Sequence, residues 1–298
     1  MVRLLGLGDN TVDIYLTEGM QYPGGNAVNV AVHARRCGAA ASYLGCLGRD
    51  MLGDLVFQSL LAEGVDLSHA RRIDGPNPWS RIRHENGDRI FAGSNPGVRD
   101  RYELTAADHA FIGRHDLVHT TVHSGLDPQM PVVRSCARVL SYDYSEHWDR
   151  RGVAATMRHV DVAFLSGARR DEGECVSLAR RCAAQGPRMV VVTRGRHGAI
   201  TLTDGTVVRV AAHPATVIDT LGAGDAFIAA FLVSHGAGLP VAECLDRGAR
   251  CAAEVCGSKG AFGHGVPIVP GQPGLDPASI VRREDTPISK RQRKGVLP

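Results

Sequence analysis

The stretch IDTLGAGDAF, residues 218–227, leads from strand-like residues into the apolar run 226–233 of an expected helix. Between them lie Gly222, Ala223 and Gly224, whose small or absent side chains leave the backbone N–H groups accessible. The first N–H groups of a helix lack internal partners, and the helix dipole favours negative charge beside them. The stretch therefore predicts a strand-to-helix turn that binds phosphate, or a developing oxyanion, without a lysine.

Asp225 follows this turn directly, and two roles are open to it. As an N-cap it would contribute about 1 kcal/mol to helix stability. As a base it would accept the proton of an alcohol while a phosphoryl group arrives, which is how kinases of other folds use an aspartate. Because the helix dipole favours the ionised form, we expect a low pKa. Capping alone does not explain the two glycines or Asp219, so catalysis is favoured, and the two roles are compatible.

Short apolar runs alternate with helical segments along most of the chain. The expected strands are 3–8, 41–48, 116–122, 138–144, 160–166 and 188–193, and the expected helices include 25–38 and 51–64. Strands that alternate with helices usually pair in parallel, with helices on both faces of their sheet. The sequence therefore predicts an α/β fold built on a doubly wound, mostly parallel sheet.

Residues 79–95, WSRIRHENGDRIFAGSN, depart from this alternation. Two strand-like runs are joined by Asn86-Gly87, which is the strongest short signal for a β-hairpin. A ribbon without a helix of its own buries little surface. We expect either a flap over a site or a simple hairpin at the edge of the sheet.

Length and composition limit the classes of protein. The 298 residues, 44% of them hydrophobic, can bury a full core in one large α/β domain or two smaller ones. No apolar run approaches the roughly 20 residues that a bilayer requires. Charge appears too early at the N-terminus for a signal peptide, so a cytoplasmic location is expected. The net charge of +3 does not by itself indicate nucleic acid as a partner.

The segment 270–298 is rich in proline, glycine and charge and has no periodicity, which predicts a disordered tail. Contact with nucleic acid is one interpretation of its basic end, and a solvated end is favoured. The basic residues concerned are Lys290, Arg291, Arg293 and Lys294.

His119, Thr121 and His123 follow one another at the spacing that places them on one face of a strand. A metal site would need a third ligand that the sequence does not show. Histidines with a structural role, or contacts to a sugar, are therefore favoured over a metal.

The stretch DTLGAGDAFIAAFL (219–232) resembles the C-terminal signature of the ribokinase, or PfkB, family of carbohydrate kinases. GGNAVNVAVHARRCGAAASYLGCLG (24–48) is similar to the N-terminal signature of that family. The resemblance covers about residues 2–265. It implies a ribokinase-like kinase domain over 1–269, with a small β lid formed by segments 10–22 and 79–95.

Within the family the chain most resembles the fructoselysine 6-kinases. The residues that carry this likeness are GDNTVDIY (8–15), YPGGNAVNVAVHA (22–34), GDRIFAGSNPGV (87–98), HDLVH (115–119), LSYDYSEHWD (140–149), DVAFLSG (161–167) and GAFGHG (260–265). Several of these stretches lie where the family binds sugar, so the likeness bears on the substrate as well as on the fold.

The resemblance also implies roles for the residues of the opening stretch. Asp225 corresponds to the catalytic base, and Gly222, Ala223 and Gly224 correspond to the anion hole. Asp219 corresponds to a residue associated with a monovalent cation such as K⁺. The implied nucleotide-binding residues are Thr193, Gly195, Gly198, Thr220, Gly222 and Gly224.

The implied sugar site lies in the first part of the chain. Asp13, Asn29 and the glycine pair Gly24-Gly25 correspond to sugar-binding positions. Asn26 stands where ribokinase itself has a lysine, so ribose is not favoured. Asp9 joins this group because it ends the first expected strand, where open α/β sheets bind ligands, although an Asx turn is the alternative there.

The implied function is phosphorylation of a primary hydroxyl with ATP and Mg²⁺, with the 6-hydroxyl of fructoselysine or another fructosamine as the favoured acceptor. Rival acceptors are fructose, 2-keto-3-deoxygluconate and a nucleoside, and a rival of another class is a non-catalytic sugar-binding sensor. The partners expected are a small sugar and ATP, with no membrane. The sequence leaves the oligomeric state open, with a homodimer as one candidate.

One departure from the family pattern concerns Mg²⁺. The family often carries Asn-x-x-Glu after the strand equivalent to 160–166, where this chain has Ser166 at or near the asparagine position. Acids follow only at Asp171, Glu172 and Glu174. These acids either help to hold Mg²⁺ or open the next helix, where negative charge suits the helix dipole.

Overall fold

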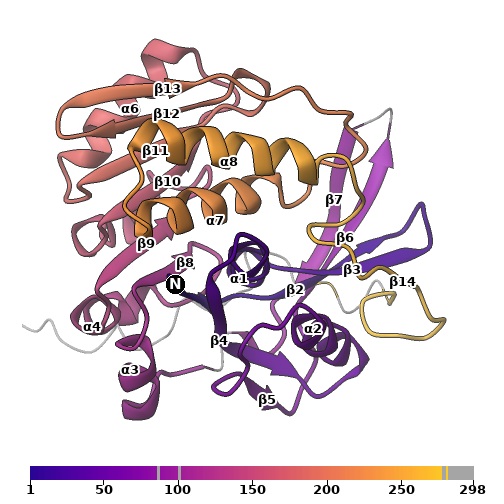
Figure 1. Cartoon of the computed structure of the whole chain (residues 1–298). Helices are drawn as coiled ribbons and strands as arrows, with labels where there is room; N and C mark the ends of the chain where they lie inside the picture. Colours follow the sequence, from indigo (N-terminus) through magenta and orange to yellow (C-terminus); the bar gives the residue numbers. More distant parts are fainter. Residues whose placement is uncertain (86–87, 100–101, 277–279, 281–298) are drawn as a thin grey trace, which may run out of the picture.

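The structure, a computed structural model, describes residues 1–85, 88–99, 102–276 and 280. Its large sheet consists of β1 (Arg3–Gly8), β4 (Ala40–Gly48), β5 (Arg71–Ile73), β8 (Leu117–Thr121), β9 (Val139–Asp143), β10 (Val162–Ser166), β11 (Met189–Thr193), β12 (Ala199–Thr203) and β13 (Thr206–Val210). The strand order is β13-β12-β11-β10-β9-β8-β1-β4-β5 (Figure 1). Neighbours from β5 to β11 pair in parallel, whereas β12 and β13 are antiparallel. The predicted mostly parallel sheet is confirmed.

Helices cover both faces of this sheet. The helices on one face are α1 (Asn26–Arg36), α2 (Met51–Ala62), α7 (Ala223–Gly236) and α8 (Val241–Val255). The helices on the other are α3 (Ala106–Ile112), α4 (Met130–Cys136) and α6 (Glu172–Ala183). Short elements complete the chain: α5 (Arg151–Ala154), η2 (Asp127–Gln129), η3 (Met157–His159) and η4 (Gly195–His197).

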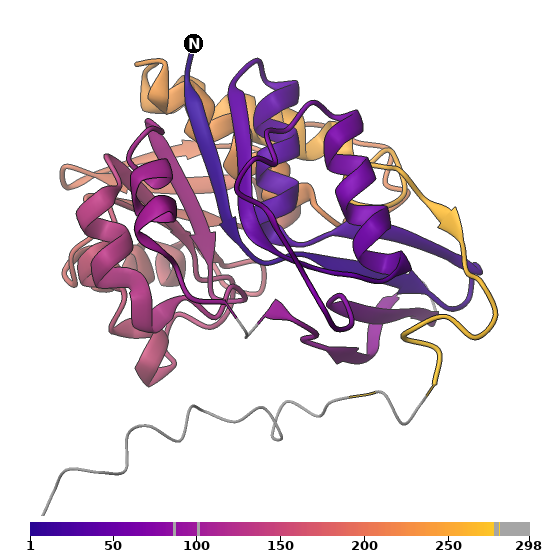
Figure 2. The ribbon, with the colours of Figure 1, turned by 90° about the horizontal axis from the view of Figure 1, so that it is seen from below.

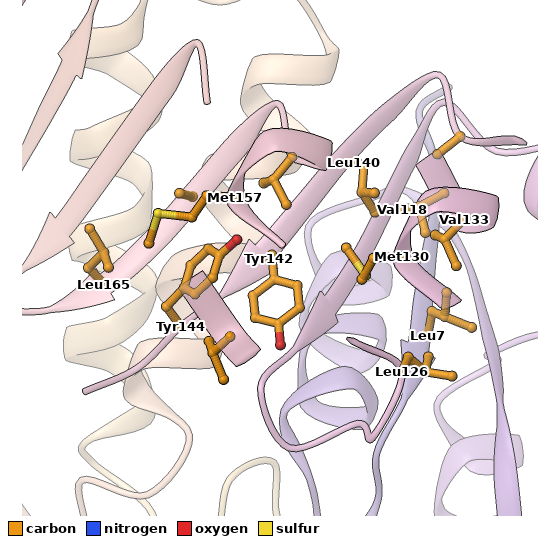
Figure 3. Packing of buried hydrophobic residues seen from close by; sticks show 14 of the residues in the cluster. Leu7, Val118, Leu126, Met130, Val133, Leu140, Tyr142, Tyr144, Met157 and Leu165 are labelled. Atoms are coloured by element: carbon orange, nitrogen blue, oxygen red, sulfur yellow. The ribbon is translucent and has the colours of Figure 1, made fainter. Parts of the chain in front are cut away.

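The alternation of side chains along the strands creates these two cores. Leu4 of β1 packs in the cluster that contains Phe231 of α7, whereas its neighbour Leu5 packs in the cluster that contains Met130 of α4. Figure 3 shows part of the second cluster, in which Leu7, Val118 and Leu140 lie near side chains of α4. A sheet with both faces buried needs the nearly continuous apolar runs seen in the sequence.

A smaller sheet lies beside the large one (Figure 1). Its strands are β2 (Thr11–Tyr15), β3 (Met20–Gly24), β6 (Trp79–Glu85), β7 (Asp88–Asn95) and β14 (Val266–Pro267), in the order β14-β3-β2-β6-β7. Segments 10–22 and 79–95 therefore belong to one sheet, as the small β lid requires. The hairpin of β6 and β7 is confirmed, and its Asn86-Gly87 turn lies outside the described residues.

The predicted start of the disordered tail, at residue 270, is too early in the chain. Gln272 exchanges side-chain hydrogen bonds with Gln21 of β3, at 2.7 and 3.1 Å. Arg81 of β6 donates to the carbonyl groups of Gly274 and Asp276. Residues 270–276 are thus bound to the small sheet through buried polar groups, which a composition rule does not detect. Residues 277–279 and 281–298, with the four basic residues named above, lie outside the described part.

The described helices include none that is long and apolar enough to cross a membrane. Figure 2, a view turned by 90°, shows the two helical layers on either side of the large sheet and the small sheet beside them. The first turns of α1 and α7 lie at the carboxyl ends of the parallel strands, where open α/β sheets bind their ligands. This edge is where the predicted site residues must be sought.

Candidate active site

The close approach of α1 to β1 sets the position of the site. A Cβ on Gly6 would lie 2.2 Å from the carbonyl oxygen of Ala27, so only glycine lets the helix pack this closely on the strand. The N-cap of α1 is Gly25, which has no side chain to cap the helix. Asp9, just beyond β1, serves instead: its two carboxylate oxygens accept from the amides of Asn26 and Ala27, at 2.8 and 2.9 Å.

Two amides of α1 hold the carboxyl group of Asp225. Asn29 Nδ2 donates to Asp225 Oδ2 at 2.6 Å, and Asn26 Nδ2 donates to Oδ1 at 2.7 Å. These asparagines lie one helical turn apart and so share a face of α1. The structure thus brings together three residues that the sequence assigned to the base and to the sugar site.

Asp225 is not the N-cap of α7. Gly222 occupies that position, and no side chain makes a capping hydrogen bond there. Asp225 lies in the first turn, and its carboxyl group is turned toward α1. The capping interpretation is therefore wrong, and the carboxyl group is available for another role.

The pKa expected for Asp225 is wrong as well. Burial raises the pKa of this carboxyl group to about 8, with further raising by the charges of Asp143 and Asp9. The hydrogen bonds from Asn29 and Asn26 act in the opposite direction. A helix dipole contributes only about 0.3–1 kcal/mol at such a place, which is less than the cost of removing a carboxylate from water among other acids. The side chain nevertheless keeps a partly exposed surface.

Asp143, at the end of β9, is a site residue that the sequence reasoning missed. Its Oδ2 accepts from Asn26 Nδ2 at 2.9 Å, and its Oδ1 accepts from the amide of Ser145 at 2.8 Å. Burial and the charge of Asp9 raise its pKa to about 6. Its position at the carboxyl end of a parallel strand is a signal that could have identified it.

His119 orients the side chain of Asn26. Its Nε2 lies 2.8 Å from Asn26 Oδ1, and its Nδ1 lies 2.8 Å from the hydroxyl of Ser141. Burial lowers the pKa of His119 to about 3, so the ring is neutral and carries one proton. Because an amide oxygen only accepts, Nε2 donates to Asn26 and Nδ1 accepts from Ser141. This tautomer turns the NH₂ group of Asn26 toward the two carboxyl groups. Of the two alternatives favoured for this histidine, a structural role or a sugar contact, its hydrogen bonds within the protein support the structural one.

The glycine turn before α7 has the open geometry of an anion site. Gly222 has a φ of 78°, and a Cβ there would lie 2.6 Å from the Cα of Ala261, so the turn requires glycine. At Gly224 a Cβ would meet nothing within 4 Å, so the turn faces open space. The amide of Ala223 bonds to Thr220 O at 3.4 Å, a weak contact. The residues predicted for the anion hole lie together at the start of α7, and their role stays a prediction.

Asp219 connects this turn to the small sheet. Its carboxylate accepts from the hydroxyl of Tyr15 in β2 at 2.6 Å, from the amide of Leu221 at 3.0 Å and from the amide of Gly260 at 3.1 Å. These hydrogen bonds fix the carboxyl group of Asp219 at the start of the turn. A carboxylate oxygen is a ligand type that a monovalent cation accepts, and the role of Asp219 beside such a cation stays a prediction.

The glycine pair Gly24-Gly25 is required by the packing of the chain itself. A Cβ on Gly24 would lie 2.7 Å from Asp13 Oδ2, and one on Gly25 would lie 2.5 Å from the Cα of Asn10. The side-chain oxygens of Asn10 and Asn29 are buried without a hydrogen-bond partner among the described residues. Buried acceptors usually have donors, so this end of the site suits a ligand rich in hydroxyl or amine groups.

Three of the residues predicted to border the nucleotide lie at the end of β11 and in the turn that follows it. Thr193 ends β11, and Gly195 and Gly198 form the turn to β12 with φ of 55° and 80°. A Cβ on Gly198 would lie 2.0 Å from the carbonyl oxygen of Val210, so the fold requires this glycine with or without a ligand. Thr220 is exposed beside the anion turn. Their contacts to a nucleotide stay predictions.

The acids after β10 lie at the N-cap and in the first turn of α6. Asp171 and Glu174 form a reciprocal capping box, and Glu172 pairs with Arg194 at 3.0 Å and with Arg209 at 2.7 Å. The alternative in which these acids serve the helix is therefore confirmed. Over the described residues, His, Cys, Asp and Glu form no group of three that could hold a metal ion.

Replacing Asp225 with asparagine should change how stability depends on pH. An unfolded aspartate has a pKa of about 3.9. With a folded pKa of about 8, the folded state binds more protons between these values, so the free energy of unfolding falls as pH rises through this window. Urea unfolding of the wild type and Asp225→Asn, from about pH 5 to about pH 8.5, should show this extra fall in the wild type alone. Parallel curves would contradict the raised pKa.

His119→Leu should destabilise the fold by about 1–3 kcal/mol, because Asn26 Oδ1 would remain buried without a donor. The partly exposed His109 of α3 provides the control, since a surface substitution such as His109→Leu usually changes stability by less than about 0.5 kcal/mol. Chemical denaturation of the three proteins makes the comparison. Equal stability of the two variants would exclude the orienting role of His119.

Comparison with known proteins identifies relatives of the chain. The family model "pfkB family carbohydrate kinase" matches residues 5–133 and 153–267. The chain is 39% identical to fructosamine kinase FrlD of Bacillus subtilis, over 89% of this chain and 95% of that protein. It is 33% identical to fructoselysine 6-kinase of Escherichia coli, over 88% of this chain and 100% of that protein.

Solved structures share the fold. Ribokinase of Arabidopsis thaliana, complexed with ribose and ATP, superposes with a TM-score of 0.77 over 95% of this chain and 96% of that one, at 19% identity. Ribokinase of Thermotoga maritima superposes with a TM-score of 0.72 over 96% of this chain and 97% of that one, at 18% identity. With the family model and the relatives covering most of its length, the chain belongs to the pfkB family of carbohydrate kinases.

Proposed function

We propose that this kinase phosphorylates a fructosamine such as fructoselysine at its 6-hydroxyl. Its family uses ATP with Mg²⁺. Relatives at 39% and 33% identity are named for fructosamine and fructoselysine. The observation that carries the proposal is Asp225, a carboxyl group held by two amides beside an open glycine turn.

In this proposal Asp225 accepts the proton of the acceptor hydroxyl as the phosphoryl group arrives. A pKa near the working pH suits a general base, and burial supplies that value. Asn26 and Asn29 hold the carboxyl group in one orientation. A catalytic group that is already oriented lowers the entropic cost of reaching the transition state. The amides of Gly222–Gly224 at the positive end of α7 stabilise the charge of the transferring group.

The remaining predicted residues have supporting roles. Asp9, Asp13, Gly24, Gly25, Asn26 and Asn29 form the sugar side, and Thr193, Gly195, Gly198 and Thr220 border the nucleotide. The carboxylate of Asp219 would help to hold a monovalent cation such as K⁺. Bound Mg²⁺ supplies positive charge to the phosphates. The lid segments 10–22 and 79–95 exclude water, which competes as a phosphoryl acceptor.

Location and assembly complete the proposal. We place the enzyme in the cytoplasm, because its phosphoryl donor is ATP. A homodimer is the assembly to be tested, by size-exclusion chromatography with light scattering.

Asp225→Asn should lower kcat by at least about 100-fold while KM for both substrates stays within a few fold, because general base catalysis contributes about 10²–10⁴-fold. Asp127→Asn is the matched control: this carboxyl group is also partly buried, accepts a hydrogen bond from Tyr142 at 2.5 Å and lies outside the proposed site. Steady-state kinetics of the purified variants measure both effects. A kcat near the wild-type value in Asp225→Asn would refute the assignment of the base.

A panel of acceptors tests the substrate. With saturating ATP and Mg²⁺, kcat/KM for fructoselysine should exceed the values for fructose, 2-keto-3-deoxygluconate and a nucleoside by at least about 10-fold, a discrimination that one good polar contact can provide. A higher value for fructose would reverse the choice. If no acceptor led to ATP consumption, the chain would instead be a sugar-binding sensor.

A further inference from the structure

Three carboxyl groups converge on one residue. Asp9 accepts from the backbone amide of Asn26, while Asp143 and Asp225 both accept from its side-chain nitrogen. Because one nitrogen bridges them, the carboxyl groups of Asp143 and Asp225 lie within two hydrogen-bond lengths of each other. Throughout the described chain, no arginine, lysine or histidine forms an ion pair with any of the three.

The unpaired polar atoms at this place are also acceptors. Asn29 is 3% exposed, and its Oδ1 has no partner among the described residues although its Nδ2 binds Asp225. The Oδ1 of Asn10, beside Gly25, is also buried and has no hydrogen-bond partner among the described residues. A site with excess negative charge and vacant acceptors is complementary to a ligand that brings donors and a positive charge.

The carboxyl groups of Asp143 and Asp225, both only partly exposed, accept hydrogen bonds from different kinds of donor. Both oxygens of Asp225 accept from side-chain amides, which fixes it for proton transfer. Asp143 accepts one side-chain and one backbone hydrogen bond and keeps a partly exposed surface. Each carboxylate oxygen can accept a further hydrogen bond, so Asp143 has room for a donor from a ligand.

A fructosamine carries such a donor. Its C1 bears a secondary amine that is protonated near neutral pH, whereas fructose bears a neutral hydroxyl there. In the furanose ring, C1 and C6 are attached to the two carbons that flank the ring oxygen. The amine and the 6-hydroxyl are therefore held a short distance apart on one edge of the sugar, a span that matches two carboxyl groups bridged by one amide.

We propose that Asp143 binds the protonated C1 amine of the substrate while Asp225 faces its 6-hydroxyl, so that Asp143 selects a fructosamine over fructose. This inference rests on the proposed function. A bound ammonium also offsets the repulsion among Asp9, Asp143 and Asp225, which favours the ionised form of the base. The charge of the correct substrate thereby helps to prepare the group that reacts with it.

The first test leaves the protein unchanged. Wild-type kcat/KM is measured for fructoselysine and for its neutral isostere, in which an ether oxygen replaces the C1 amine. We expect the amine to be preferred by at least about 10-fold, as for other sites built around a specific polar group. Equal values for the two compounds would overturn the inference while the proposed function stands. No turnover of fructoselysine would instead refute the proposed function, and the inference with it.

The second test assigns the preference to one residue. Asp143→Asn should reduce the amine-to-ether ratio of kcat/KM at least about 10-fold, with most of the loss in the amine. The ratio isolates charge recognition, because a general disturbance of the site lowers both values alike. Asp127→Asn, whose carboxyl group bonds to Tyr142 on the same strand as Asp143, should leave the ratio unchanged. An unchanged ratio in Asp143→Asn would show that this residue does not recognise the amine.

Discussion

The side-chain amide of Asn26 is the interaction on which the candidate site depends. Its nitrogen donates to Asp143 and Asp225, and its oxygen accepts from His119. The amide thus bridges two acids that would otherwise repel each other and separates them by a fixed distance. Without it, the end of β9 and the first turn of α7 would bring uncompensated carboxyl groups together, at a high cost in free energy.

The scaffold supports this amide in two ways. Gly6 allows α1 to approach β1 closely, and Asp9 binds the first amides of α1, which places Asn26 at the carboxyl edge of the sheet. Neutral His119 of β8 donates to the oxygen of the Asn26 amide, so the NH₂ group of that amide faces the acids. Both supports come from neighbouring strands of a buried parallel sheet, a rigid base from which to position reactive groups.

The electrostatics of the site reverse the expectation drawn from α7 alone. A helix N-terminus stabilises a carboxylate, yet burial and two neighbouring acids raise the pKa of Asp225 to about 8. A carboxyl group in this range is a stronger base than an exposed aspartate, and its ionisation responds to charge brought by a ligand. Selection of a cationic substrate and activation of the base can therefore share one physical origin.

The sequence by itself determined the mostly parallel sheet, the hairpin of the small sheet and the glycine turn before Asp225, because these follow from local periodicity and from residues with special backbone requirements. Through resemblance to a family it also predicted Asn26 and Asn29 as residues of the sugar site and Asp225 as the base, but not the hydrogen bonds between them. Only the tertiary structure decided the roles of Asp143 and His119, the raised pKa of Asp225 and the attachment of residues 270–276 to the small sheet. These features arise from contacts between residues far apart in the chain, and burial and charge at such contacts have no signature in any single stretch of sequence.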